Sequence, residues 1–272
     1  MTKIALKGVR QVFSVRSTEE RHPQEFVALD DLTLEVADGE LLTLVGPSGC
    51  GKSTVLDLIS GLSRPAAGTV EVNGREVSGP GLDRGVVFQQ YTLLPWRTAL
   101  GNIEFALEAA GAGSRGERRR TAAEYLRLVG LAEFADRYPH ELSGGMKQRV
   151  AIARSLSYQP DVLLMDEPFG ALDAQTRERL QEELLQIWRR TGTTIVFITH
   201  DIEEAVFLGQ RVAVMSARPG RIETTIPIVL DRTSHEDDVR STTQFARYRH
   251  QIWEMLRQPA ASSVAEEVHQ VA

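Results

Sequence analysis

The order of hydrophobic and polar positions predicts a sheet in the first third of the chain. Apolar and polar residues alternate over residues 32–36, which predicts the first strand, whereas residues 41–45 are apolar except for Thr43, as is typical of a strand buried on both faces. Residues 70–72 precede Asn73 and Gly74, a pair that readily supplies the positive φ angles of a tight hairpin turn. We therefore expect the early strands to be partly antiparallel.

The pattern changes to helical periodicity after a predicted strand at residues 85–88. Helices are expected at residues 102–110, 117–129 and 145–157, with a Gly/Ser-rich break at residues 111–116 between the first two. The middle third of the chain is therefore predicted to be a helical insert, over approximately residues 91–158.

Strands are predicted again in the last third of the chain, at residues 162–165, 194–198 and 211–215. The helix expected between the first two carries one apolar face, formed by Leu180, Leu184, Ile187 and Trp188. Alternation of strands and helices predicts a parallel sheet covered by helices.

The chain becomes polar beyond Arg232, so we divide it into a main domain at residues 1–232 and a C-terminal extension at residues 233–272. One further amphipathic helix is predicted in the extension, followed by a frayed Ala/Ser/Glu tail. The apolar face of that helix would consist of Phe245, Tyr248, Ile252 and Leu256.

The composition, 42% hydrophobic and 25% charged, is that of a globular protein. The 31 basic and 37 acidic residues give a net charge of -6, so no global positive field attracts nucleic acid, and a nucleic-acid partner is not expected. A single cysteine favours a reducing, cytoplasmic setting. Residues 1–13 do not resemble a signal peptide, and the apolar runs are shorter than the ~20 residues of a membrane-spanning helix. Any membrane role is therefore expected to come through a partner.

A glycine-rich loop lies between the buried strand at residues 41–45 and an apolar-periodic helix. Glycines let successive backbone N–H groups surround a β-phosphate, toward which the helix directs its positive N-terminal end. We predict that Lys52 neutralises the β and γ oxygens and that Ser53 ligates Mg²⁺. This loop alone does not separate kinases, GTPases and transport ATPases. It consists of Gly46, Pro47, Ser48, Gly49, Cys50, Gly51, Lys52 and Ser53.

Cys50 has two interpretations within this loop. It is either a tolerated loop residue or a reactive thiol whose pKa is lowered by the helix N-terminus.

Polar residues at the carboxyl ends of predicted strands supply candidates for catalysis. Asp166 and Glu167 end the strand at residues 162–165, where Asp166 can hold Mg²⁺ through water and Glu167 can orient and deprotonate the attacking water. His200 follows the next strand and can contact the γ-phosphate, and Gln89 can reach Mg²⁺ or the attacking water through its amide oxygen. Taken singly, these residues are equally compatible with polar turns and surface positions.

A second candidate anion site opens the helix predicted at residues 145–157. Ser143 is a good helix cap, and Gly144 and Gly145 expose backbone N–H groups. Because the helical insert intervenes, no feature of the sequence places this site near the glycine-rich loop of the same chain.

With these motifs in this order, the sequence resembles the nucleotide-binding subunits of ABC transporters, over roughly residues 3–228. The resemblance implies a P-loop NTPase fold of the α/β class, with a RecA-like parallel sheet core, an N-terminal antiparallel β subdomain and the inserted α-helical subdomain. It identifies residues 46–53 as the Walker A loop, to which Thr54 is added as an ATP-binding residue, and Gln89 as the Q-loop residue. Asp166 matches Walker B, Glu167 the catalytic glutamate, Asp173 the D-loop and His200 the switch histidine.

In that family, Ser143, Gly144 and Gly145 complete the ATP site of the opposite subunit, so the resemblance implies a dimer that closes on MgATP. Two departures from the pattern stand out. Met146 replaces the glutamine common at the end of this signature, and Phe13 stands where a tyrosine more often stacks on adenine. A polar stretch at residues 14–25 leaves Phe26 as an alternative to Phe13, and either phenylalanine is also compatible with the core.

The resemblance also implies partners: an integral membrane permease subunit and, indirectly, an extracytoplasmic solute-binding protein, with this chain peripheral on the cytoplasmic face of the membrane. Residues 93–96 form an apolar cluster that either contributes to a docking groove for the permease or packs inside the helical insert. Residues 79–81, 84–89, 93–97 and 102–103 are similar to importers of taurine, aliphatic sulfonates and nitrate. The alternative is a soluble ABC ATPase that acts on nucleic acid or ribosomes, although such proteins usually carry long coiled-coil insertions or two fused ATPase units.

Overall fold

The computed structural model describes residues 1–15, 24–232 and 238–257. The predicted frayed tail at the C-terminus and most of the polar stretch that follows Phe13 lie outside the described residues.

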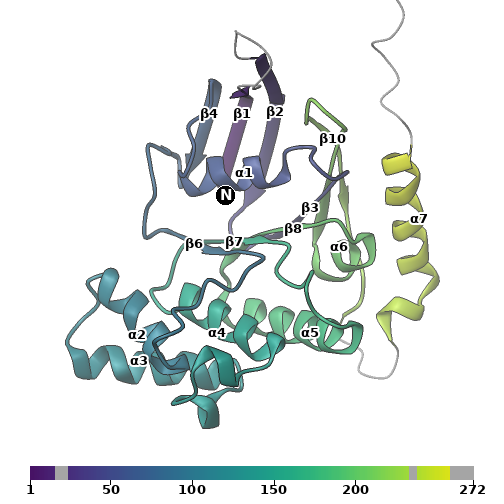
Figure 1. Cartoon of the computed structure of the whole chain (residues 1–272). Coiled ribbons are helices and arrows are strands. Elements are labelled where there is room, and N and C mark those ends of the chain that lie inside the picture. Colours follow the sequence, from purple (N-terminus) through teal and green to yellow (C-terminus); the bar gives the residue numbers. More distant parts are fainter. Residues whose placement is uncertain (16–23, 233–237, 258–272) are drawn as a thin grey trace, which may run out of the picture.

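Two sheets form the upper and central parts of the molecule (Figure 1). The first is antiparallel, with the strand order β2-β1-β4-β5. Its tight turn lies at Asn73 and Gly74, where φ is 53° and 70°, so the predicted hairpin is confirmed. The strands are β1 (Thr2–Val15), β2 (Gln24–Ala37), β4 (Ala67–Val72) and β5 (Arg75–Glu76).

The second sheet has the strand order β10-β9-β3-β8-β7-β6 and is parallel except for β10, which pairs antiparallel with β9. The parallel sheet predicted from the alternating pattern is therefore confirmed. Its strands are β3 (Leu41–Val45), β6 (Arg84–Val87), β7 (Val162–Asp166), β8 (Thr194–Thr199), β9 (Arg211–Met215) and β10 (Ile222–Pro227).

Helices cover both faces of the six-stranded sheet. Helix α1 (Lys52–Ser60) shares a core with the antiparallel sheet, whereas the remaining helices enclose a second core on the other face (Figure 1). These helices are α2 (Ala99–Ala109), α3 (Arg115–Leu128), α4 (Gly144–Leu156), α5 (Ala174–Thr191), α6 (Ile202–Leu208) and α7 (Thr243–Arg257), with short 3₁₀ helices at Ala132–Phe134, Pro139–Glu141 and Val239–Ser241.

The expectation that the sheet starts at Leu32 is wrong, because β1 precedes it. Gly8 has a φ of 57°, and the pairing of β1 with β2 shifts register between Leu6 and Val9. This irregularity interrupts the apolar alternation that would have predicted the strand. The edge strand β10 was also not expected.

Helix positions follow the predictions more closely than helix ends do. Helix α2 begins at Ala99 instead of residue 102, because the Thr98 hydroxyl accepts a hydrogen bond from the Gly101 amide at 3.1 Å and caps the helix. The apolar face predicted for α7 is confirmed, since Phe245 and Ile252 are buried and Tyr248 and Leu256 pack against the core.

Candidate functional site

The glycine-rich loop connects β3 to α1 and requires glycine at several positions. A Cβ on Gly46 would lie 2.7 Å from the sulfur of Cys50, and one on Gly51 would lie 2.6 Å from Leu29 Cδ2. Gly51 also has a φ of 104°, which L side chains rarely adopt. The loop is therefore packed tightly enough that its backbone, not its side chains, forms the surface available to a ligand.

Lys52 is buried inside this loop. Its ammonium group donates hydrogen bonds to the carbonyls of Gly46 (2.8 Å) and Pro47 (3.1 Å). A cation held at the centre of a loop of backbone N–H groups, at the N-terminus of a nine-residue helix, fits the phosphates of a nucleotide.

Ser53 and Asp166 come together from α1 and the end of β7, as their predicted roles require. The two side chains are hydrogen-bonded, an effect that lowers the pKa of Asp166, but burial is the larger effect and raises that pKa above its ordinary value. The described residues include no group of three or more His, Cys, Asp or Glu side chains that could hold a metal by themselves. One carboxylate and one hydroxyl fit Mg²⁺ that arrives bound to phosphates, since Mg²⁺ usually keeps several waters and few protein ligands.

Glu167 contacts His200 at the carboxyl edge of the sheet. The Nδ1 atom of His200 lies 3.0 Å from Oε2 of Glu167, and the histidine side chain is 59% exposed. Glu167 has a φ of 43°, an uncommon conformation for a residue with a side chain, and its amide donates to the Ile198 carbonyl at 3.0 Å. The two residues predicted to act on the γ-phosphate and on water thus lie side by side.

Gln89 borders the same place. A Cβ on Gly170 would lie 3.6 Å from Gln89 Nε2 and 3.9 Å from Glu167 Oε2, so the amide and the carboxylate flank one glycine. The structure therefore brings Gln89, Glu167 and His200 together from three separate segments of the chain.

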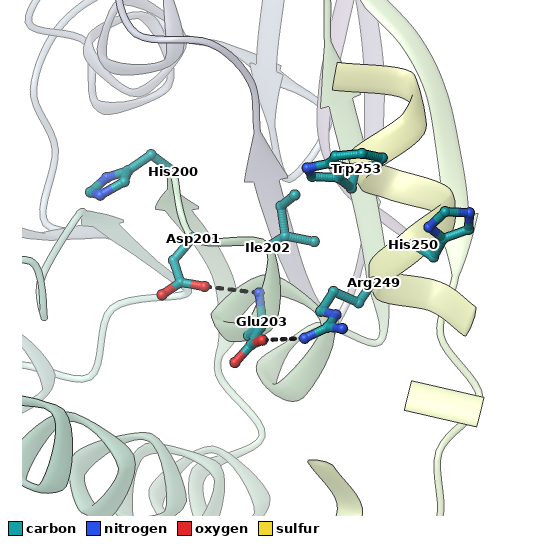
Figure 2. Close-up of a pocket in the computed structure, with 7 residues that line it drawn as sticks. All are labelled: His200, Asp201, Ile202, Glu203, Arg249, His250 and Trp253. Atoms are coloured by element: carbon teal, nitrogen blue, oxygen red, sulfur yellow. Dashed lines mark hydrogen bonds and ion pairs between the residues drawn. The ribbon is translucent and has the colours of Figure 1, made fainter. Parts of the chain in front are cut away.

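A cavity of about 720 Å³ adjoins this site between the start of α6 and helix α7 (Figure 2). Asp201 caps α6 by accepting hydrogen bonds from the amides of Glu203 (2.8 Å) and Glu204 (3.2 Å). Glu203 in turn pairs with Arg249 of α7 at 2.8 Å. The residues that line the cavity include His200 but none of the glycine-rich loop, so this cavity is not the predicted nucleotide site.

The predicted signature lies elsewhere, at the start of α4. The Ser143 hydroxyl accepts a hydrogen bond from the Met146 amide at 3.3 Å and caps the helix. A Cβ on Gly144 would lie 3.1 Å from Leu172, and one on Gly145 would lie 2.7 Å from Thr176. Helix α4 packs on the face of the six-stranded sheet opposite α1 (Figure 1), so the signature does not join the loop of its own chain.

Asp173 caps helix α5 in the segment beside the signature. Its Oδ1 accepts a hydrogen bond from the Thr176 amide at 2.9 Å, a bond that lowers the pKa of this carboxyl group. Asp173 therefore holds the start of α5, which is the segment that the signature glycines contact.

Phe13 and Phe26, the two candidates for stacking on adenine, stand directly opposite each other on β1 and β2. Phe13 is 39% exposed, whereas the guanidinium of Arg218 lies over the ring of Phe26, 5.0 Å from its centroid. Arg218 also donates to the Gly49 carbonyl at 2.8 Å. The ring of Phe26 is thus already partnered, while that of Phe13 is open, which favours Phe13. No pattern in the sequence indicated Arg218.

The interpretation of Cys50 as a reactive thiol is wrong. Its side chain is 1% exposed, and burial raises the pKa of the thiol, although nearby Lys52 and Arg218 oppose the effect. Desolvation outweighs the helix N-terminus at this position.

Comparisons with known proteins agree with this geometry. Residues 29–170 match the family model described as ABC transporter. The chain is 52% identical over 236 residues to the nitrate import ATP-binding protein NrtD of Synechocystis sp., covering 85% of this chain and 88% of that protein. It is 47% identical over 240 residues to the taurine import ATP-binding protein TauB of Rhizobium johnstonii, covering 87% and 91%.

A solved structure is also similar, a dimeric ATP-binding cassette in a post-hydrolysis state, bound to ADP and Pi. Its TM-score is 0.70 at 36% identity, and the match covers 83% of this chain and 99% of that one.

Proposed function

This chain belongs to the ABC transporter family, and from that premise we propose that it is the ATP-binding and hydrolysing subunit of an importer that takes up a small anionic solute such as taurine, an aliphatic sulfonate or nitrate. The observation that carries the proposal is the joint placement of the phosphate loop, Asp166, Glu167 and His200 at one edge of the sheet, in a chain about half identical to nitrate and taurine import proteins.

The residues at that edge have different roles in hydrolysis. The loop amides and Lys52 hold the phosphates, and Ser53, Asp166 and Gln89 are the candidates to hold Mg²⁺, which would neutralise charge on the phosphate oxygens. Glu167 orients the attacking water and accepts its proton. His200 fixes the Glu167 side chain and faces the γ-phosphate. Phe13 is the candidate to stack on the adenine.

Two copies are needed for a complete site. Ser143, Gly144 and Gly145 offer a helix N-terminus for anions but lie on the other side of the sheet from α1 of their own chain. A second, head-to-tail copy can supply this turn to the γ-phosphate, with Asp173 near the contact. Binding of ATP then closes the dimer, and hydrolysis opens it. The dimeric cassette with ADP and Pi supports this arrangement.

A groove beside α2 and α4 is suited to the permease. Its cavity of about 430 Å³ is mainly apolar, and its lining residues include two arginines but no carboxylate. We infer that a short amphipathic helix of the permease docks its apolar side chains here. Among the exposed or half-buried residues that line the groove are Leu62, Leu82, Phe88, Leu94, Phe105 and Tyr158.

The predicted apolar cluster at residues 93–96 contributes to this groove only in part. Leu94 lines the groove, Leu93 packs against the core and Trp96 is 70% exposed. Within the described residues, no helix combines the length and apolar character required to cross a bilayer. We propose that the permease holds the chain on the cytoplasmic face of the membrane and receives solute from an extracytoplasmic binding protein.

Uptake measurements test this proposal. Deletion of the gene in the source cells should abolish ATP-dependent uptake of at least one of ¹⁵N-nitrate, taurine or an aliphatic sulfonate, and the wild-type chain should restore it. Glu167→Gln should not restore uptake, although a tagged form should still co-purify with an integral membrane protein. Unchanged uptake of all these anions, together with retention of the chain on ribosomes or DNA, would overturn it.

A further inference from the structure

A single arginine on the signature helix holds the chain segment that follows Gln89. Arg154 of α4 donates to the Thr92 carbonyl at 2.7 Å, to the Thr92 hydroxyl at 2.9 Å and to the Tyr91 carbonyl at 3.4 Å. Burial lowers the pKa of this guanidinium, so the protein keeps a desolvated cation at this point. The planar guanidinium presents two nitrogens to three acceptor oxygens, an arrangement that the single ammonium nitrogen of lysine cannot reproduce.

The segment that Arg154 holds is strained. Thr92 has a φ of 47°, a conformation that is a genuine outlier for a β-branched residue. Such strain persists only where the surroundings determine the conformation, and it concentrates at switch regions. Here the hydrogen bonds from Arg154 engage both the backbone and the side chain of the strained residue.

The same segment also touches the other end of α4. Gly144 is the first residue of the helix, and a Cβ added to it would lie 3.1 Å from the Tyr91 hydroxyl. Gly144 and Arg154 are ten residues apart, which is about 15 Å along an α-helix. Tyr91 therefore lies against the start of α4, and Tyr91 and Thr92 are hydrogen-bonded to Arg154 towards its end.

Arg154 and Thr92 both line the groove described above. On the basis of the proposed function, we propose that Arg154 is a positioning residue that couples occupancy of this groove by the permease to the placement of Gln89 and Ser143. A helix seated in the groove presses on Thr92, and because Arg154 ties Thr92 to α4, the signature turn moves together with Gln89. Without Arg154 the contact of Tyr91 with Gly144 remains, but the hydrogen bonds that tie Thr92 to α4 are lost.

The test compares variants in the membrane complex, purified through a tag on this chain and reconstituted in nanodiscs. Arg154→Met keeps most of the side-chain volume but removes the three hydrogen bonds. We expect kcat for ATP to fall about tenfold while KM stays within about twofold, because alignment is lost rather than nucleotide binding. The ratio of hydrolysis in the complex to hydrolysis by the detached subunit should approach one. Arg154→Lys should recover only a small part of the loss.

Arg118→Met is the matched control. Arg118 also belongs to the helical insert and donates to a backbone carbonyl, that of Gly113 at 2.8 Å, but it is not among the residues that line the groove. It should behave like the wild type. The double variant Arg154→Met/Thr92→Gly should lose no more than Arg154→Met alone, because the Thr92 hydroxyl has already lost its donor.

Wild-type kcat and full stimulation in Arg154→Met would overturn the inference while leaving the proposed function intact. If no membrane protein co-purifies with the wild type, the proposed function fails instead. The inference then loses its groove occupant as well, but the Arg154–Thr92 link can still be tested by a fall in kcat of the detached subunit. Should Arg154→Met not fold, the kcat and KM of Arg154→Lys decide the matter in the same way.

Discussion

The backbone of Glu167 adopts a left-handed conformation directly after the end of β7, beside strand β8. Its amide donates to Ile198 of the neighbouring strand β8, and its carboxylate meets His200, which follows that strand. A φ of 43° at a residue with a side chain costs free energy that the surroundings must offset. This placement is the physical reason to regard Glu167, rather than Asp166, as the residue that acts on water.

Replacement of Glu167 by glutamine should therefore separate binding from hydrolysis. We expect Glu167→Gln to bind ATP with nearly wild-type affinity and to hydrolyse it roughly 10²- to 10⁴-fold more slowly, because the amide cannot accept the proton of water. Single-turnover assays measure the rate of hydrolysis. Size-exclusion chromatography with light scattering measures the oligomeric state, and ATP should trap the variant as a dimer. Glu203→Gln, which loses only an exposed ion pair with Arg249, is the control. Near-normal turnover in Glu167→Gln would refute the assignment.

Glu204 provides a test of the electrostatics next to the site. This carboxyl group is buried beside Gln181, whose amide donates to it at 3.0 Å, and burial raises its pKa despite hydrogen bonds from Gln181 and Thr199. A pKa raised in the folded state means that ionisation costs stability, and the cost grows as pH rises above the ordinary carboxyl value.

Glu204→Gln should therefore melt at a higher temperature than the wild type at pH 8, and the difference should shrink as pH falls toward the ordinary pKa of glutamate. Differential scanning calorimetry at several pH values measures the difference. Glu182→Gln, at an exposed position of α5, should follow the wild type throughout. A difference that stays constant with pH, or a less stable Glu204→Gln at pH 8, would contradict this prediction.

At the scale of elements, the start of α2 depends on one buried amide. Asn102 accepts a hydrogen bond from the Leu94 amide at 2.8 Å and donates to the carbonyls of Leu94, Arg97 and Thr98 at 3.0 to 3.2 Å. Its side chain is fully buried. It thereby fixes the loop before α2, including Leu94 in the groove.

Asn102→Ala should lower the free energy of unfolding by about 2 to 3 kcal/mol, because several buried backbone groups lose their partner. Urea unfolding followed by circular dichroism measures the loss, and Gln175→Ala at an exposed position of α5 should change little. A loss below about 0.5 kcal/mol would mean that the loop satisfies these groups by other means.

Elements with continuous or regular patterns could be predicted from sequence, whereas irregular ones could not. The buried strand β3 could be predicted because it is almost wholly apolar, and the apolar face of α7 because it keeps the helical period throughout. Strand β1 was missed because the register shifts near Gly8 break its alternation. The start of α2 was misplaced because a side-chain cap, and not hydrophobicity, determines it.

In the site, too, contiguous motifs could be predicted from the sequence, whereas contacts between residues far apart in the chain could not. Motifs such as residues 46–53 and 143–145 are contiguous, so their chemistry is readable from the chain alone. Arg154 lies 62 residues from Thr92, and Arg218 lies 169 residues from Gly49. Contacts over such separations arise only from the fold, and nothing in one sequence indicates them.

At the scale of the whole molecule, the two sheets are joined close to the phosphate loop. The segment after β9 forms an isolated bridge between Gly220 and Leu29, and the Gly220 amide donates to the Ala28 carbonyl at 2.9 Å. Arg218 of the same segment reaches the loop at Gly49. The antiparallel sheet, which carries Phe13, is therefore held in a fixed relation to the loop that is predicted to hold the phosphates.

The phosphate loop and the signature turn, in contrast, are separated by the six-stranded sheet, so a complete ATP site must be shared between two copies. Mixing two inactive variants tests this most directly. Lys52→Ala damages the loop and Ser143→Arg the signature, so every site in either homodimer is defective. In a heterodimer, one site combines an intact loop with an intact signature. With random pairing, half of the dimers are mixed and each has one working site, so the equimolar mixture should recover up to about a quarter of wild-type hydrolysis. A mixture as inactive as its components, or full activity of Ser143→Arg alone, would contradict the account.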